Sequence, residues 1–153
     1  MSDSAEERLQ AAGIVLPPAS NPAASYTNFV EVNGLLFVSG KGAPARDGVS
    51  PAGKLGAEFT TAEGYQHARL AGIEVLAVVK AALGSLDRVK RVVKIQGFIN
   101  ADPQFSEHHK VLDGCSDLML EVFGERGVHA RSVFGANSLR SHLPVIIDSI
   151  FEV

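Results

Sequence analysis

The sequence has little cysteine, little excess charge and no long apolar run, and each shortage narrows what the chain can be. A single cysteine, Cys115, excludes an internal disulfide framework. No apolar run approaches the roughly 20 residues needed to span a bilayer, and the N-terminus has no secretory pattern. These absences predict a protein of the reducing cytoplasm with no membrane partner.

The charge balance and the histidines argue against two further classes of protein. Lysine and arginine number 14 against 17 acidic residues, which gives a formal net charge of −3 and no broad basic surface for nucleic acid. Among the five histidines only His108 and His109 are neighbours, and adjacent side chains diverge on a helix. No other pair has the spacing of helical metal ligands, so we predict no metal site.

The length of 153 residues fits one domain, residues 1–153, in which residues 1–24 are an N-terminal helix (Ser4–Gly13) and a connector. Asn33-Gly34 separates two strand-like runs in Tyr26–Gly40, which is the signature of a β-hairpin. Thr60 and Glu63 form a capping box at the start of a helix over Thr60–Gly84. The other predicted elements are a loop over Lys41–Glu58, a strand over Val89–Asn100 with Val93, Ile95 and Ile99 on one face, a helix from about Phe105 or Lys110 to Phe123, and strands over Ala130–Ala136 and Pro144–Val153.

The order ββ-α-β-α-ββ predicts a sheet that two helices cover on one face. The last strand carries apolar residues on both faces, with Ile146 and Ile150 on one and Ile147 and Phe151 on the other. Such a strand is covered on both faces. Because the chain offers no third layer, we predict that copies of the chain pack on the free face.

Arg131 lies in a run that otherwise has the pattern of a half-buried strand. An arginine is almost never buried unless it is paired, and its planar fork suits a carboxylate. The partner is either a structural Asp or Glu or a ligand. The segment Gly48–Leu55 has a Gly-Lys pair at phosphate-loop spacing, but Leu55 replaces the required Ser or Thr, so we interpret it as loop.

Four segments together carry a family resemblance: "NGLLFVSG" (Asn33–Gly40), "LGSLDRVKRVVKIQGFIN" (Leu83–Asn100), "SDLMLEVFGERG" (Ser116–Gly127) and "HARS" (His129–Ser132). In this order they resemble the YjgF/RidA family, also known as the endoribonuclease L-PSP family. The resemblance implies a chorismate-mutase-like α+β fold, a homotrimer with a central barrel, and clefts between subunits. It further implies deaminases that hydrolyse enamines or imines to keto acids and ammonia, without metal or bound cofactor.

The resemblance also implies roles for individual residues. Arg131 falls on the arginine that binds the substrate carboxylate, and Tyr26 on a tyrosine that lines the cleft from the neighbouring subunit. Ser39 and Gly40 fall on the small pair whose backbone approaches the ligand.

Three positions depart from the family pattern. The glutamate that positions the water aligns with Ile146, the helix asparagine with Asp113, and the cysteine two residues after the arginine with Val133. Asp148 lies on the same strand face as Ile146, about 6.6 Å further along. The binding half of the site is therefore expected to remain, while the chemical half lacks the family glutamate, and Asp148 could replace it only through a bridging water or a shifted ligand.

Two functions follow as hypotheses. The first is a trimer that binds a small carboxylate or imino acid at Arg131, left free of any protein counter-charge, and hydrolyses an imine or enamine. The alternative is a trimer that binds a small metabolite without catalysis, because Ile146 replaces the glutamate. Ribonuclease activity has been attached to some family members, but the negative net charge does not favour RNA binding.

Overall fold

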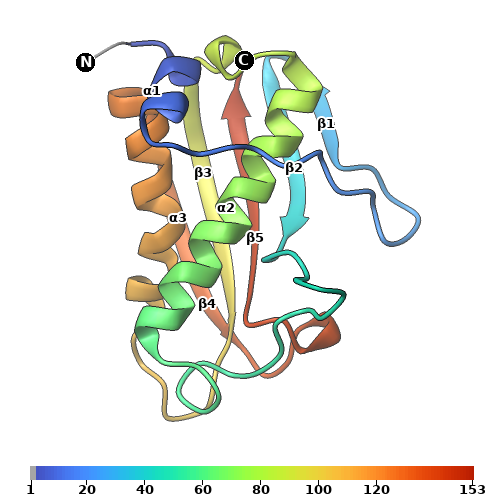
Figure 1. The fold of residues 1–153 in the computed structure, drawn as a ribbon, viewed down its shortest axis with the longest axis vertical. Helices are drawn as coiled ribbons and strands as arrows, with labels where there is room; N and C mark the ends of the chain where they lie inside the picture. Colours follow the sequence, from blue (N-terminus) through green and yellow to red (C-terminus); the bar gives the residue numbers. More distant parts are fainter. Residues whose placement is uncertain (1–2) are drawn as a thin grey trace.

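The computed structural model describes residues 3–153, in which five strands form one mixed sheet with two helices on one of its faces (Figure 1). In chain order the elements are α1 (Ala5–Ala11), β1 (Phe29–Val32), β2 (Leu35–Lys41), α2 (Thr61–Leu83), η1 (Leu86–Arg88), β3 (Arg91–Asn100), α3 (His108–Phe123), η2 (Gly124–Gly127), β4 (Ala130–Ala136), η3 (Arg140–His142) and β5 (Val145–Glu152). The sheet order is β1-β2-β5-β3-β4, and only the β3–β4 pair is parallel. The predicted α+β architecture is confirmed.

The hairpin β1–β2 forms because its turn residues accept left-handed backbone. Asn33 has φ of 51° and Gly34 has φ of 76°, the conformation that a two-residue hairpin turn requires. The two strands pair antiparallel from Val32 opposite Leu35 outward. The predicted hairpin is therefore confirmed at its turn.

Helix α2 is bounded by the residues that the sequence indicated. Thr60 accepts a hydrogen bond from the backbone N–H of Glu63 at 3.2 Å, and the Glu63 carboxylate accepts one from the N–H of Thr60 at 3.0 Å. This reciprocal capping box satisfies two amide groups at the helix start. Gly84 ends the helix with φ of 83°, a conformation that glycine adopts without strain.

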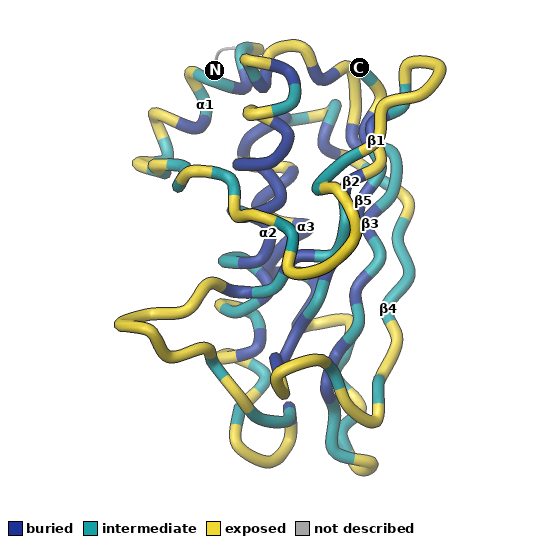
Figure 2. The backbone as a smooth tube through the Cα atoms, turned by 90° about the vertical axis from the view of Figure 1, so that its right-hand side faces the viewer, coloured by how far each residue is buried: buried dark blue, intermediate teal, exposed yellow. Residues whose placement is uncertain are grey.

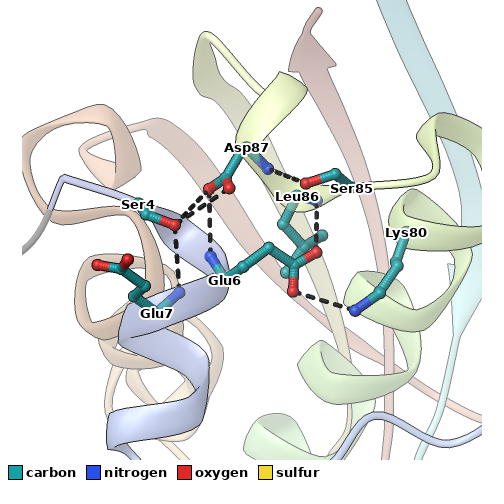
Figure 3. Close-up of polar contacts among 7 residues, drawn as sticks. All are labelled: Ser4, Glu6, Glu7, Lys80, Ser85, Leu86 and Asp87. Atoms are coloured by element: carbon teal, nitrogen blue, oxygen red, sulfur yellow. Dashed lines mark hydrogen bonds and ion pairs between the residues drawn. The ribbon is translucent and has the colours of Figure 1, made fainter.

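The N-terminal helix α1 is fixed to the turn between α2 and β3 by acidic side chains (Figure 3). The Asp87 carboxylate accepts hydrogen bonds from the hydroxyl of Ser4 at 2.9 Å and the N–H of Glu6 at 3.2 Å. The Glu6 carboxylate in turn accepts from the N–H of Leu86 and from the Lys80 ammonium, both at 3.0 Å. These links join α1 to both η1 and α2.

At the start of strand β3 the side chains point to the opposite faces of the sheet from those predicted. A register shift lies between Val92 and Lys94, so Val92, which is fully buried, takes the core position that the alternation gave to Val93. From Ile95 to Ile99 the predicted alternation holds, and both are fully buried. An extra residue at a bulge reverses the facing of everything before it, which explains the error.

Within residues 3–153 no helix lies over the face of the sheet opposite α2 and α3, which we call the free face (Figures 1 and 2). On β5 the residues Ile147, Ser149 and Phe151 are buried under the helices, whereas the alternating residues Ile146, Asp148 and Ile150 are half-buried. Large apolar side chains that remain exposed on β1, β2 and β4 are Val30, Val32, Phe37 and Phe134. The two-sided apolar pattern of β5 is confirmed. Within residues 3–153 no helix combines the length and apolarity that crossing a membrane requires.

Candidate functional site

Four of the residues proposed from the sequence meet in one hollow on the free face of the sheet. Tyr26, Ser39, Gly40 and Asp148 are among the residues that line this hollow, whose volume is about 520 Å³. Tyr26 comes from the segment before β1, Ser39 and Gly40 from the end of β2, and Asp148 from the middle of β5. The β2–β5 pairing brings them together, because Val38 lies opposite Ser149. We call this feature the Asp148 hollow.

Ile146 lies next to the Asp148 hollow. A Cβ atom built on Gly40 would lie 2.9 Å from Cγ2 of Ile146, so a residue larger than glycine at position 40 would displace that side chain. Ile146 and Asp148 are on the same face of β5, as predicted. The position of the family glutamate is therefore apolar, and the carboxylate lies two residues further along.

Asp148 is a half-buried carboxyl group without an ion-pair partner in residues 3–153. Burial raises its pKa, and the nearby Lys94 charge opposes the rise. Its Cα partner on β3 is Gln96. An acid with a raised pKa keeps its proton to a higher pH than an ordinary aspartic acid does.

The Tyr26 side of the hollow is held by a buried lysine that the sequence did not reveal as important. The Lys41 ammonium donates to Asn28 Oδ1 at 2.7 Å and to Ser20 Oγ at 3.0 Å, and burial lowers its pKa. The Ser39 hydroxyl donates to the carbonyl of Thr27 at 2.6 Å. Together these bonds attach the segment that carries Tyr26 to the end of β2.

The contacts of Arg131 contradict the expectation that its guanidinium is free of any protein counter-charge. Its Nη1 donates to Asp113 Oδ1 at 2.8 Å, so the guanidinium already has a counter-charge in its own chain. Nη1 also donates to Ser116 Oγ at 3.1 Å, and Nη2 donates to the carbonyl of His109 at 3.2 Å. All three partners belong to α3, so the arginine joins β4 to that helix. The physical reason is the departure at position 113: an aspartate there brings a charge where the family has a neutral asparagine.

Ser116 and His129 complete the cluster around Arg131, and sequence reasoning gave neither a role. Ser116 Oγ lies 2.9 Å from His129 Nε2, and His129 Nδ1 lies 2.6 Å from the carbonyl of Gly127. Burial lowers the His129 pKa. A neutral ring that donates from Nδ1 to the carbonyl accepts the Ser116 hydroxyl at Nε2, which leaves the serine lone pairs for Arg131. The sequence signal for this cluster was the spacing of Asp113 and Ser116, which lie three residues apart and therefore on one face of α3.

The two groups of predicted residues lie apart within one chain. Arg131 is on β4 at one edge of the sheet and faces α3, whereas Asp148 is on β5, two strands away, and faces the opposite side. A single copy therefore holds the Asp148 hollow and the Arg131–Asp113 pair as separate features.

The fold and the position of the hollow define a class: mixed-sheet α+β proteins with a chorismate-mutase-like arrangement. Residues 6–147 match the family described as "YjgF/chorismate_mutase-like, putative endoribonuclease". This chain belongs to that family. It is 44% identical over 147 residues to Protein TCP17 of Trypanosoma cruzi, a match that covers 95% of this chain and 91% of the relative.

Two solved structures share both fold and sequence with the chain. A "putative endoribonuclease" from Shewanella oneidensis is 34% identical with a TM-score of 0.94, covering 98% of this chain and 99% of that one. The protein Atu1372 from Agrobacterium tumefaciens is 39% identical with a TM-score of 0.88, covering 97% and 92%. The predicted family is therefore confirmed over nearly the whole chain.

Proposed function

We propose that this protein is an oligomeric YjgF-family hydrolase that takes a small imine or enamine into the Asp148 hollow and releases a keto acid and ammonia. The observation that supports this most directly is the meeting of Tyr26, Ser39, Gly40 and Asp148 in one hollow of about 520 Å³. The raised pKa of Asp148 adds a proton-transfer group to it. A positioned acid or base typically contributes about 10²–10⁴-fold to such a reaction.

The proposed chemistry needs one carboxyl group and one water molecule. The protonated Asp148 gives its proton to the imine nitrogen, and the water oxygen bonds to the carbon while the C=N double bond becomes single. The Asp148 carboxylate then takes a proton from the added water. Asp148 then returns its proton to the carbinolamine nitrogen, the C–N bond breaks to release ammonia, and the hydroxyl proton passes to the Asp148 carboxylate as the carbonyl forms. An enamine first gains a proton at carbon and loses one from nitrogen to become the imine.

The assembly is part of the proposal, because the free sheet face carries apolar side chains that water solvates poorly. Val30 and Phe134 are 54% and 49% exposed, and Phe37 is 40% exposed. Burying apolar surface contributes roughly 25 cal/mol per Å², so an assembly that covers this face is favoured, and we infer the homotrimer that the family resemblance implies. In such a trimer the β4 edge of one copy, with Arg131, faces the Asp148 hollow of the next.

Arg131 then acts as a partly neutralised anchor for a ligand carboxylate. Its side chain is 27% exposed, and three of its five N–H groups donate to Asp113, Ser116 and His109. Two N–H groups of Arg131 remain for a ligand carboxylate, which competes with Asp113 for the positive charge of the guanidinium. E. coli TdcF, which shares the fold at 20% identity and a TM-score of 0.64, was solved with bound serine, and serine is therefore a suitable binding probe here.

The test is a coupled assay in which an amino-acid oxidase generates 2-iminopropionate and its decay is followed with and without the protein. Wild-type protein should accelerate decay, and Asp148→Asn should lose about 100-fold or more of that acceleration. Asp47→Asn, the same change on an exposed loop, is the matched control and should retain full activity. Equal rates for wild type, Asp148→Asn and buffer would overturn the proposal for this substrate.

A second candidate is a trimer that binds a small metabolite without turning it over. Two observations favour it: Ile146 occupies the glutamate position beside Gly40, and Arg131 is paired with Asp113. Saturable binding of serine or pyruvate to wild type, measured by calorimetry, with no acceleration of imine decay would establish this function in place of the first. Sedimentation at micromolar concentration tests the trimer that both candidates require.

A further inference from the structure

Lys54 is a half-buried cation that has no carboxylate partner in residues 3–153. Its Nζ donates to Asn100 Oδ1 at 2.8 Å and to the backbone carbonyl of Asn137. Both acceptors are neutral. An ammonium group has three N–H donors, so one donor and the whole positive charge remain for another group.

The ammonium lies at a hollow of about 540 Å³ at the end of β3, away from the Asp148 hollow. The polar residues that line it are Lys54, Glu58, Asn100, Asn137, Ser138 and His142. Asn100 is fully buried and is held in place because its Nδ2 donates to the carbonyl of Gly53 at 3.2 Å. Asn137, Ser138 and His142 are exposed, so the hollow is open to small molecules from solvent.

The two loops that form this hollow are fixed relative to each other by backbone contacts. The N–H of Gly53 donates to the carbonyl of His142 at 2.9 Å. Ser141 and His142 both have left-handed backbone, with φ of 54° and 55°. Non-glycine residues adopt this conformation at a cost of about 1–3 kcal/mol and retain it where the surroundings impose it. The hollow is therefore a built feature and not a gap between loose loops.

Glu58, the one carboxylate at this hollow, is directed at the backbone and not at the Lys54 ammonium. Its Oε1 accepts a hydrogen bond from the N–H of Lys54 at 2.9 Å. Gly53 permits this approach, since a Cβ at that position would lie 2.7 Å from Cβ of Glu58, and its φ of 148° also favours glycine. The Lys54 charge is thus left for an external anion.

We propose that this hollow is a second binding site, independent of the proposed catalytic function, and that it takes a small oxyanion. The ligand group is a carboxylate or phosphate that contacts the Lys54 ammonium, with the Ser138 hydroxyl and the Asn137 and His142 side chains beside it as further donors. A compact ammonium suits either anion as a point charge. The openness of the site and the single cation predict weak, salt-sensitive binding.

The test is a titration of the uniformly ¹⁵N-labelled protein with inorganic phosphate and, separately, with pyruvate at low salt, up to about 10 mM, where a weak site saturates. Saturable shifts at the amides of residues 52–54 and 137–142 are expected with one or both anions. The comparison between the two distinguishes a phosphate site from a carboxylate site. Shifts at Tyr26, Ser39 and Asp148 would report the other hollow, so the two sites are read separately.

Lys54→Met keeps the length of the side chain and removes its charge, and it should weaken binding at least about tenfold. Lys90→Met, the same change on an exposed residue elsewhere, is the control and should bind as wild type does. Because Lys54→Met also removes two hydrogen bonds to the loops, Ser138→Ala is a second variant; Ser138 is exposed and lines the hollow, and the change takes away only the hydroxyl donor that the proposal assigns to the anion. It should weaken binding without lowering the melting temperature. Absence of saturable shifts, or wild-type affinity in Lys54→Met, would overturn the proposal.

Discussion

The guanidinium of Arg131 and the carboxylate of Asp113 form an ion pair of 2.8 Å between β4 and α3. The negative charge of Asp113 largely cancels the attraction of Arg131 for a second anion. A carboxylate ligand at Arg131 must therefore compete with Asp113. We expect Asp113→Asn, which places the family's neutral amide at this position, to raise the affinity for pyruvate several-fold. The gain is limited because exposed pairs are worth only about 0.2–1 kcal/mol. Isothermal calorimetry measures the change.

The matched control for this prediction is Asp117→Asn, on the same helix but bonded to the hydroxyl of Tyr65 at 2.7 Å. It removes the same charge from α3 and should leave pyruvate affinity unchanged. If the two variants raised affinity equally, the effect would be one of net charge and not of the Arg131 pair. If neither did, Arg131 would be a purely structural link between β4 and α3.

The helices α2 and α3 approach each other closely at two glycines, which predicts very different costs for the same substitution. A Cβ on Gly114 would lie 2.0 Å from the backbone oxygen of Tyr65, whereas a Cβ on Gly72 would meet the side chains of Leu118 and Cys115 at 2.9 and 3.1 Å. Side chains move more easily than helix backbone. Gly114→Ala should therefore lower the free energy of unfolding by about 2 kcal/mol or more, and Gly72→Ala by about 1 kcal/mol or less.

Urea denaturation at one fixed protein concentration measures both variants, because the proposed assembly would make stability depend on concentration. Alanine raises helix propensity by up to about 1 kcal/mol over glycine at each site, so the difference between the variants reports packing alone. Equal stabilities would mean that the helices separate at little cost.

The local elements were predictable because their signals lie within a few residues. Asn33-Gly34 specifies its own hairpin turn, and Thr60 with Glu63 specifies its own helix start, whatever the rest of the chain does. The bulge at Val92 was not predictable in this way, since it arises from pairing with β5, some 60 residues away in the register that joins Val92 to Phe151.

The candidate site likewise has a part that the sequence predicted and a part that it did not. Family likeness brought Tyr26, Ser39 and Gly40 forward, strand alternation from Ile146 added Asp148, and the four residues share one hollow. The Arg131–Asp113 pair was missed because it joins α3 to a strand 18 residues further along the chain, and no pattern within the helix indicates which strand side chain lies opposite Asp113.

The thiol of Cys115 is expected to be inert in the folded protein. The residue is fully buried between α2 and α3, and burial raises its pKa to about 12. The thiolate is the reactive form, so a disulfide reagent at pH 8 should label the native protein only as fast as it unfolds. Labelling in urea should be rapid and complete. Fast labelling of the native state would show that the helix pair opens readily.

The pH dependence of stability should carry a contribution from Asp148. Because its folded pKa is raised, the native state binds the proton more tightly than the unfolded chain does. The contribution is therefore present below the ordinary Asp pKa of about 3.9 and is lost as the pH rises through the folded pKa. Asp148→Asn should be more stable than wild type at pH 7 and equal to it at low pH. Denaturation midpoints at both pH values check the sign, with Asp47→Asn as the control.

Ile146→Glu tests whether the apolar residue at the glutamate position limits the chemistry. The new carboxylate would lie on the same face of β5 as Asp148, about 6.6 Å along the strand, and beside Gly40, whose missing Cβ leaves room for the side chain. If Asp148 alone is poorly placed to direct water, imine decay should accelerate by about 10-fold or more over wild type.

The double variant Ile146→Glu with Asp113→Asn restores both family residues and should exceed either single change. Ile146→Gln adds the same length without the charge and should not accelerate decay; if it matches Ile146→Glu, the gain comes from polarity in the hollow and not from a second proton-transfer group.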